Sequence, residues 1–387
     1  MDNQSKVKKG LPAFIGVAAV WMGTHFGPGV ASGTQLDVYY VKYGIPGICM
    51  TVFAMALLAC ALYCSMEFSR IYKTYDYQSW VEKLFGMKWF VILFDISFLV
   101  TIITALGGSL NAVATLLNNF AGLNYWLGVI IVIACAMLLC AYGADLVRKA
   151  SSYMMFVVVG ILIVIMILVI TKGDGDMAGS IANQKANLPD VSWGKAIWSA
   201  VIYACFQATV VANIASVADG LEDRRASKKA AVTGFIANSL LLIVLCLTIF
   251  SYTNVYKVTD EALPFYSILQ RLGMNWLTGI YILVVFIAVL STVVGFAFAG
   301  VARFSKYYRS KKEGAKHSLR DAIFVGVMLL VCAAASKFGI VKLVSTGYKI
   351  LGYLNLPIIV LPALFIGGKK ISKKYLKEHN IDAPGVD

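Results

Sequence analysis

The stretch "THFGPGVASGTQ", residues 24–35, interrupts what would otherwise be one long apolar helix. Glycine is entropically unfavourable in a helix, and proline lacks the amide hydrogen that the helical ladder needs, so three glycines and a proline do not hold a regular helix here. The flanking residues on both sides stay apolar. The sequence therefore predicts a membrane-spanning segment that is broken near its middle.

The composition places the whole chain in a membrane. Of 387 residues, 59% are hydrophobic and 14% are charged, with a mean hydropathy of +0.77. An average soluble chain has roughly a quarter of its residues charged. The eight cysteines fall within apolar runs, which gives no sign of a disulfide framework. The sequence shows no nucleophile elbow, phosphate-binding loop or metal-ligand spacing, so we expect neither an enzyme nor a resident cofactor.

Apolar runs of about 20 residues are long enough to cross the hydrocarbon core. Ten such runs predict an all-α membrane protein of about ten transmembrane helices, with both termini on the same side. The runs cover residues 12–42, 45–69, 89–117, 125–143, 147–172, 193–218, 231–253, 275–304, 321–337 and 340–366.

Lysine and arginine accumulate in short cytoplasmic loops. Most of the 34 basic residues lie before the first run, in alternate loops and in the tail 367–387, so we expect both termini in the cytoplasm of a multi-pass protein of the cytoplasmic membrane. Topology accounts for the net charge of +14, with contacts to anionic lipid but not to nucleic acid.

The chain divides at the polar segment 173–192 into two sets of five runs, residues 11–172 and 193–366, within one transporter domain spanning 1–387. The first run of each set enters from the opposite side, so the two sets are predicted inverted repeats. The sixth run, like the first, is interrupted: "YACFQATVVANIASVADG" (203–220) carries polar Gln207 near its centre. Paired interruptions of this kind indicate the substrate site of a secondary transporter, because irregular backbone at membrane depth must be satisfied by protein, ions or a water-filled cavity.

The break offers two kinds of backbone group. Amide groups of its outer half can receive an anion such as a carboxylate, and the glycines let the ligand approach; the predicted contacts are Gly27, Gly29, Val30 and Ala31. Unpaired carbonyls of the inner half, between Gly23 and Phe26, suit a small cation. His25 lies at the break and offers a proton-coupled alternative. The predicted pocket wall consists of Trp21, Trp198, Tyr203, Phe206, Gln207 and Tyr353.

The segment "GTHFGPGVASG" (23–33) resembles the opening helix of the YkvI-type bacterial membrane protein family. The layout of spans is more remotely similar to the amino acid/polyamine/organocation superfamily, with its five-plus-five inverted-repeat fold and broken helices one and six. This resemblance implies transport of a small amino acid, a related zwitterion or an amine. Two departures from the YkvI-type pattern are Pro28 between the glycines and "GTQ" (33–35) in place of G-Q-E.

The superfamily resemblance also implies roles for residues outside the break. Adjacent hydroxyls at Ser291 and Thr292 resemble the pair that holds sodium together with carbonyls of span one, here those of Gly23 and Phe26. Sodium is therefore the first choice of coupling ion and the proton the second. The alternative is that both hydroxyls bond their own helix.

The resemblance further places spans one and ten at the outer vestibule. Asp37 and Lys349 could then pair as an extracellular gate, whereas Lys349 could equally extend to the membrane interface.

Further expectations concern two acidic residues, an outer loop and an inner segment. Glu67 and Asp95 should meet basic residues at the inner side. Residues 254–274 should form a helical lid with Pro264 near its start, and residues 76–86 should form an amphipathic surface helix.

An amino-acid-sensing receptor of the spore-germinant-receptor type, with the same fold, is the rival to a transporter, and a passive channel is a third option. The sequence leaves the oligomeric state open.

Overall fold

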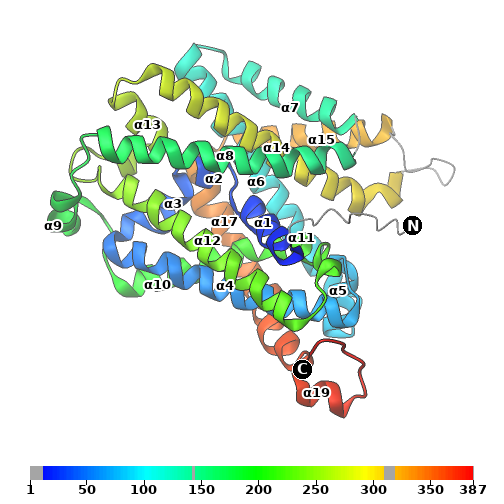
Figure 1. The fold of residues 1–387 in the computed structure, drawn as a ribbon. Coiled ribbons are helices and arrows are strands. Elements are labelled where there is room, and N and C mark those ends of the chain that lie inside the picture. Colours follow the sequence, from blue (N-terminus) through cyan, green and yellow to red (C-terminus); the bar gives the residue numbers. More distant parts are fainter. Residues whose placement is uncertain (1–11, 142–143, 309–318, 387) are drawn as a thin grey trace, which may run out of the picture.

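The protein is described from a computed structural model that covers residues 12–141, 144–308 and 319–386. These residues form a bundle of helices and contain no strand (Figure 1). The predicted all-α architecture is confirmed.

Span one is broken where the glycine–proline cluster predicts. It consists of α1 (Ala13–His25), α2 (Pro28–Ala31) and α3 (Thr34–Tyr39). Gly27 is fully extended, and Pro28 then occupies the first position of α2, where its missing amide hydrogen costs nothing. Gly33 follows with φ +87°, a left-handed conformation that glycine adopts without strain, so α3 leaves at a new angle.

The remaining helices follow the predicted spans closely. The first half continues with η1 (Val41–Tyr43), α4 (Gly44–Tyr72), α5 (Tyr77–Phe85), α6 (Phe90–Ala121), α7 (Tyr125–Ala141) and α8 (Ala144–Lys172), and α9 (Met177–Asn187) connects the halves. The second half contains α10 (Trp193–Gln207), η2 (Ala208–Val210), α11 (Val211–Ala215), η3 (Ala218–Gly220), α12 (Arg224–Phe250), η4 (Val258–Asp260), α13 (Pro264–Arg271), α14 (Asn275–Tyr308) and α15 (Leu319–Ser336). The chain ends with α16 (Ile340–Lys342), η5 (Leu343–Gly347), α17 (Tyr348–Asn355), η6 (Leu356–Val360), η7 (Pro362–Gly367), α18 (Gly368–Lys370) and α19 (Lys373–Glu378).

The number of membrane spans is not fixed at ten by these helices. Within the described residues, six helices are long and apolar enough to cross a membrane, and a bent pair, Val157–Lys172 with Met177–Asn187, would be a seventh. The pair bends by 95°, because the segment predicted as a polar loop carries α9. Helix α1 has only 13 residues because its span is broken. Each of the ten predicted ranges nevertheless contains a helix.

Span six is interrupted more gently than span one. Residues Trp193–Ala215 run as one apolar stretch, and the predicted interruption is the short 3₁₀ segment η2. A 3₁₀ turn is tighter than an α turn and shifts the hydrogen bonds by one residue. Span ten is also irregular, with π-helical segments η5, η6 and η7, of which the last two begin near Pro357 and Pro362.

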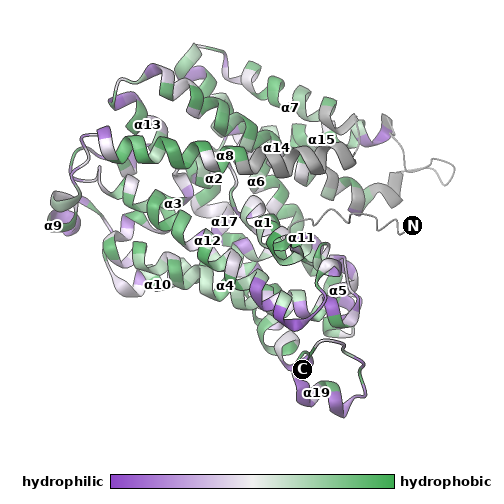
Figure 2. Ribbon diagram, in the orientation of Figure 1, coloured by the Kyte–Doolittle hydropathy of each residue, from purple (hydrophilic) through white to green (hydrophobic). Residues whose placement is uncertain are grey.

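The bundle has two polar ends. Hydrophilic residues gather at α9 on one side and at α5, α19 and the start of α12 on the other (Figure 2). We call the first end the lid side, after the lid formed by η4 and α13 (residues 258–271), and the second the basic side. Helix α13 begins with Pro264, and α5 is amphipathic and packs Trp80 inward, so the structure contains both elements that the sequence predicts there.

Ion pairs at the basic side confirm the predicted partners of Glu67 and Asp95. The fully buried Glu67 carboxylate accepts bonds from Arg70 at 2.8 Å and from Arg224 at 3.1 Å. Asp95 binds Arg303 at 2.5 Å. These pairs join helices α4 with α12 and α6 with α14.

Candidate functional site

The break of span one leaves backbone groups without partners. The carbonyl of Gly27 accepts the amides of Val30 and Ala31, at 3.1 and 3.0 Å, so two of the predicted anion-binding amides are already used. The Gly29 amide has no hydrogen-bond partner among the described residues. The Gly27 amide donates to the His25 carbonyl, so an anion would meet one free amide here instead of the four predicted.

The carbonyls on the other side of the break are the predicted cation ligands. The Gly23 carbonyl accepts no bond in the helical ladder, because the Phe26 amide donates to the Met22 carbonyl and the Gly27 amide donates to the His25 carbonyl. The Phe26 carbonyl is likewise bypassed, and within the described part of the chain neither oxygen receives a side-chain donor. Two hard oxygen atoms are thus available at the break.

One hydroxyl of the predicted pair on α14, that of Thr292, lies near the break. A methyl group built on Gly27 would lie 4.0 Å from the Thr292 Oγ1, which places this hydroxyl at the break. Across the described residues, neither Ser291 nor Thr292 makes a hydrogen bond, and both are half-buried. Other threonines in the spans, such as Thr101 and Thr248, bond the carbonyl four residues earlier at 2.9 Å. Ser291 and Thr292 therefore do not bond their own helix.

His25 joins three helices through a chain of hydrogen bonds. Its Nδ1 lies 2.7 Å from Asn238 Oδ1 on α12, and its Nε2 lies 2.9 Å from the Tyr203 hydroxyl on α10. The Asn238 Nδ2 donates to the Gly234 carbonyl, so its Oδ1 must accept from His25. A neutral His25 then carries its proton on Nδ1 and accepts from Tyr203 at Nε2. The amide of Gln207 approaches the same hydroxyl at 3.5 Å.

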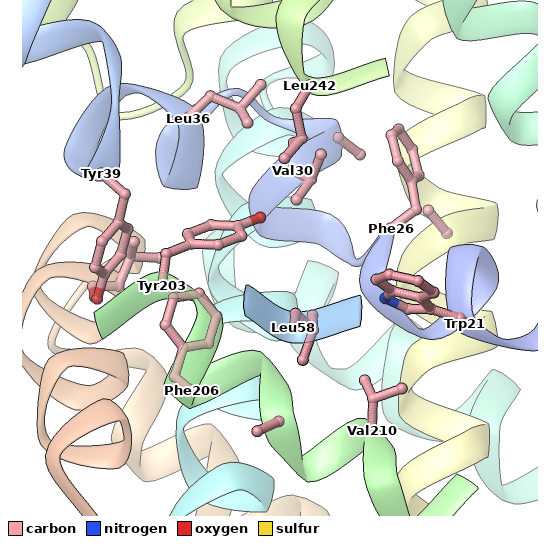
Figure 3. Packing of buried hydrophobic residues seen from close by; sticks show 14 of the residues in the cluster. Trp21, Phe26, Val30, Leu36, Tyr39, Leu58, Tyr203, Phe206, Val210 and Leu242 are labelled. Carbon is pink, nitrogen blue, oxygen red and sulfur yellow. The ribbon is translucent and has the colours of Figure 1, made fainter. Parts of the chain in front are cut away.

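Aromatic side chains form a wall on one side of the break. Tyr203 packs edge-on against Phe206, with ring centres 4.8 Å apart, and Tyr39 contacts both rings. Tyr348 of span ten stacks on Phe206 at 4.7 Å. Figure 3 shows Tyr39, Tyr203 and Phe206 grouped together, with Phe26 and Trp21 across the break from them. Trp21 lies flat against Gly234 of α12.

The break is closed toward the lid side. The Thr34 hydroxyl donates to the Ala262 carbonyl at 2.7 Å, and the Phe265 amide donates to the Ser32 carbonyl at 3.3 Å. All residues from Pro28 to Val41 are buried. Toward the basic side, Thr24 is exposed and Gly23 and Gly27 are half-buried. The break is thus less covered between Gly23 and Gly27 than between Pro28 and Val41.

Some predicted site residues are not brought together. Asp37 is 8% exposed, whereas Lys349 is exposed, and no ion pair joins them. The charged groups that act most on Asp37 are Lys42 and Asp260, because the Asp37 side of α3 faces α12 and the lid rather than span ten. The predicted gate is thus not formed in this conformation.

Two predicted wall residues lie outside the site. Tyr353 is 44% exposed and Trp198 is 48% exposed, and the two contact each other on the surface of the bundle, where the Trp198 indole nitrogen lies 3.4 Å from the Tyr353 hydroxyl. Aromatic residues on this face would meet lipid. The prediction that Tyr353 and Trp198 line the pocket does not hold in this conformation, because their helices turn them outward.

Other residues at the site were not predicted. Asn238 anchors His25, and Asn355 of span ten links the Ser97 hydroxyl to the Phe206 carbonyl at the interruption of span six. Both are fully buried. An asparagine within an apolar span is itself a signal, since a buried polar group requires partners. Tyr39, Tyr348 and Gln35 carried no comparable signal.

A cavity of about 240 Å³ opens beneath the lid. It lies between the end of α6 and α13, and Asn119, Glu261 and Tyr266 are among its lining residues. None of the predicted site residues lines it. The cavity is separate from the break.

Comparison with known proteins assigns the chain to a family. The model of the amino acid permease family matches residues 13–309. The chain belongs to this family. YkvI, an uncharacterized membrane protein of Bacillus subtilis (strain 168), is 23% identical over 350 residues, which cover 89% of this chain and 93% of that protein. The predicted resemblance is therefore confirmed.

Solved structures show the fold. A sodium-coupled sialic acid symporter, in a substrate-bound outward-open state, matches with a TM-score of 0.63 and 14% identity over 93% of this chain and 81% of that chain. MhsT in complex with L-phenylalanine matches with a TM-score of 0.63 and 14% identity, over 94% and 97% of the two chains. A manganese transporter of Eremococcus coleocola matches with a TM-score of 0.67 and 10% identity, over 98% and 85%.

These findings confirm an all-α transporter fold, and the structure has a first span that is broken. They make the protein a secondary transporter of small molecules in a membrane rather than an enzyme. Nothing in them favours the receptor alternative.

Proposed function

We propose that the protein moves a small amino acid or related zwitterion across the cytoplasmic membrane by alternating access, coupled to sodium. The permease family and the sodium-coupled structural neighbours support this assignment. The observation that carries it is a set of oxygen atoms without hydrogen-bond partners: the Gly23 and Phe26 carbonyls at the break and the Thr292 hydroxyl near Gly27. Ser291 precedes Thr292 in α14 and is the further ligand that we propose.

Sodium suits these atoms for a physical reason. Carbonyl and hydroxyl oxygens without donors cost about 1–3 kcal/mol each once a protein closes around them, so a protein keeps them where a ligand satisfies them. Neutral hard oxygen ligands favour a small hard cation. The ion would also close the gap between α1 and α14, which move relative to one another when the site changes its accessible side.

The proton is the second choice because of His25. Both ring nitrogens are already paired, with Asn238 and Tyr203, and a proton on Nε2 would require the Tyr203 hydroxyl to turn away. These hydrogen bonds hold α1, α10 and α12 together without any proton transfer. Sodium therefore remains the better candidate.

The substrate would bind beside the ion. The free Gly29 amide offers a donor for a carboxylate, and Gln207 and the aromatic wall of Tyr203 and Phe206 offer polar and apolar contacts for the rest of the molecule.

The orientation and the repeats belong to the same proposal. Residues 11–172 and 193–366 act as the two inverted repeats, and the tail 367–387 lies with the N-terminus in the cytoplasm. The hydrophilic residues at α5 and α19 support this placement, since basic residues favour the cytoplasmic side (Figure 2). The lid would then face outward.

A thermal-shift screen tests the proposal. Purified protein is heated with each of the twenty protein amino acids, in sodium chloride and in choline chloride. A ligand that binds only the folded state raises the melting temperature, and sodium should enlarge the shift of at least one amino acid because coupled ligands strengthen each other. Shifts of equal size in both salts would contradict sodium coupling, and no shift with any amino acid would contradict the substrate class.

A further inference from the structure

Gln35 lies against the break although it is six residues from Gly29 in the sequence. Its side chain points back along α3, over the left-handed turn at Gly33, and covers the backbone of Gly29. A methyl group built on Gly29 would lie 2.5 Å from the Gln35 Nε2 and 2.6 Å from its Cδ. The two residues are therefore in direct contact, and only glycine leaves room for the carboxamide.

The Gln35 carboxamide is buried but not satisfied. The residue is 4% exposed, and its Oε1 has no hydrogen-bond partner. Its neighbours are paired: the Ser32 and Thr34 hydroxyls lie 2.9 Å apart, and Tyr39 donates to the Val344 carbonyl. The residue that carries this unpaired acceptor is thus in contact with Gly29, whose amide is also unpaired. A buried amide oxygen without a donor is unfavourable unless a ligand supplies that donor.

Gln35 also belongs to the aromatic part of the site. Its side chain lies beside the hydroxyl of Tyr348, whose ring stacks on Phe206. A molecule held between Gly29 and Phe206 would therefore lie against the Gln35 carboxamide. Tyr348 would limit its position on the span-ten side.

Among the described residues, no ionised side chain forms a hydrogen bond with Gln35. Asp37 lies two residues further along α3, and its electrostatic partners are Lys42 and Asp260 at the lid rather than groups of the break. Both nitrogens of His25 are used by Asn238 and Tyr203. The contact region therefore presents a neutral acceptor and a neutral donor.

We propose that Gln35 is a specificity-determining residue whose Oε1 accepts a hydrogen bond from the amino group of the substrate. The inference rests on the proposed function, since it assigns one contact within that site. Because the acceptor is an uncharged amide, it stabilises an ammonium group without neutralising it. The site then favours molecules that carry their own carboxylate, which are amino acids of zero net charge, over amines of net positive charge.

Two variants test this role in proteoliposomes. Gln35→Met keeps the length of the side chain and removes the acceptor, and Gln35→Glu keeps the shape and adds a negative charge. Gln270→Met, on an exposed lid residue, is the control. The probes are a ¹⁴C-labelled mixture of the twenty protein amino acids, then its single components, and the amines formed from them by loss of the carboxylate.

The expected results follow from the strength of a hydrogen bond to a charged group. Gln35→Met should raise KM for the preferred amino acid about 10- to 100-fold with turnover changed less than about twofold. The melting temperature should change little, because the lost contact with Tyr348 is offset by the removal of an unsatisfied buried oxygen. Gln35→Glu should raise the ratio of amine to amino acid uptake at least about tenfold. Gln270→Met should match the wild type.

Other outcomes separate the inference from the proposed function. An unchanged KM in Gln35→Met, or an unchanged amine ratio in a folded Gln35→Glu, would overturn the role of Gln35 while amino acid transport by the wild type still stood. If the wild type takes up none of the labelled amino acids, the proposed function fails, and this inference fails with it.

Discussion

Replacement of Thr292 by valine removes one oxygen from the proposed cation site and keeps the shape of the side chain. Thr292 Oγ1 makes no hydrogen bond in the described structure and lies beside Gly27 at the break, so the variant leaves no protein group newly unpaired. The cost to folding should stay within about 0.5 kcal/mol. An interaction with a charged group is worth about 1.5–3 kcal/mol, so the apparent sodium affinity should fall about 10- to 150-fold.

The assay measures initial uptake of the preferred amino acid against external sodium concentration. Thr292→Val should shift the half-saturating sodium concentration upward and leave the melting temperature in choline chloride nearly unchanged. Thr248→Val is the matched control, because Thr248 bonds its own helix at Val244. Equal sodium dependence in Thr292→Val and the wild type would refute the assignment of this hydroxyl, and a comparable shift in Thr248→Val would show that the effect is not local.

Three further predictions concern the scaffold. His25→Phe should lower the melting temperature, since it leaves Asn238 Oδ1 and the Tyr203 hydroxyl unpaired at about 1–3 kcal/mol each, and a second change, Asn238→Leu, should restore part of the loss; purely additive losses would contradict the pairing. Glu67→Ala should destabilise by about 3–5 kcal/mol because it leaves Arg70 without its buried partner, whereas the exposed Glu378→Ala should have little effect in the same melting assay. Hydrogen bonds from Gly179 and Asn254 lower the pKa of the Asp176 carboxyl. The stability that the ionised carboxylate contributes is therefore fully present above its ordinary pKa and is lost as the pH falls through the lowered pKa. Between about pH 5 and 3, the melting temperature of Asp176→Asn should fall less than that of the wild type, and parallel curves would refute this.

The sequence was sufficient for the parts of the fold that depend on composition and local chemistry. The glycine–proline cluster located the break, because Pro28 lacks the amide hydrogen of a helix interior and Gly33 adopts a left-handed conformation. Pro264 marked the start of the lid helix. The predicted ion pair of Glu67 was found because a carboxylate near a membrane interface requires a basic partner.

Features that depend on the rotation of a helix could not be predicted in this way. Asp37 and Gln35 are both polar residues of the same short helix, but the former faces α12 and the lid and the latter covers Gly29. An apolar span gives no periodic signal for which side chain faces a neighbour and which faces lipid. For the same reason Tyr353 appeared to belong to the site, although it lies on the surface.

The interruption of span six was predicted in place but not in degree. Polar Gln207 indicated a break, and the structure has only the 3₁₀ turn η2 there. A chain without glycine or proline at that point can shift its hydrogen bonds by one residue and remain helical. The pairing of Asn355 with Ser97 and the Phe206 carbonyl depends on three distant segments meeting, which no local pattern reveals.

Accumulation of the preferred amino acid against its gradient tests the central claim most directly. Proteoliposomes containing the purified protein receive labelled amino acid outside, with an inward sodium gradient, with equal sodium on both sides, or with choline instead. The account predicts an internal concentration above the external one only under the inward gradient, and its collapse when an ionophore dissipates the sodium gradient. Simple equilibration at the same rate in all three conditions would contradict coupled transport.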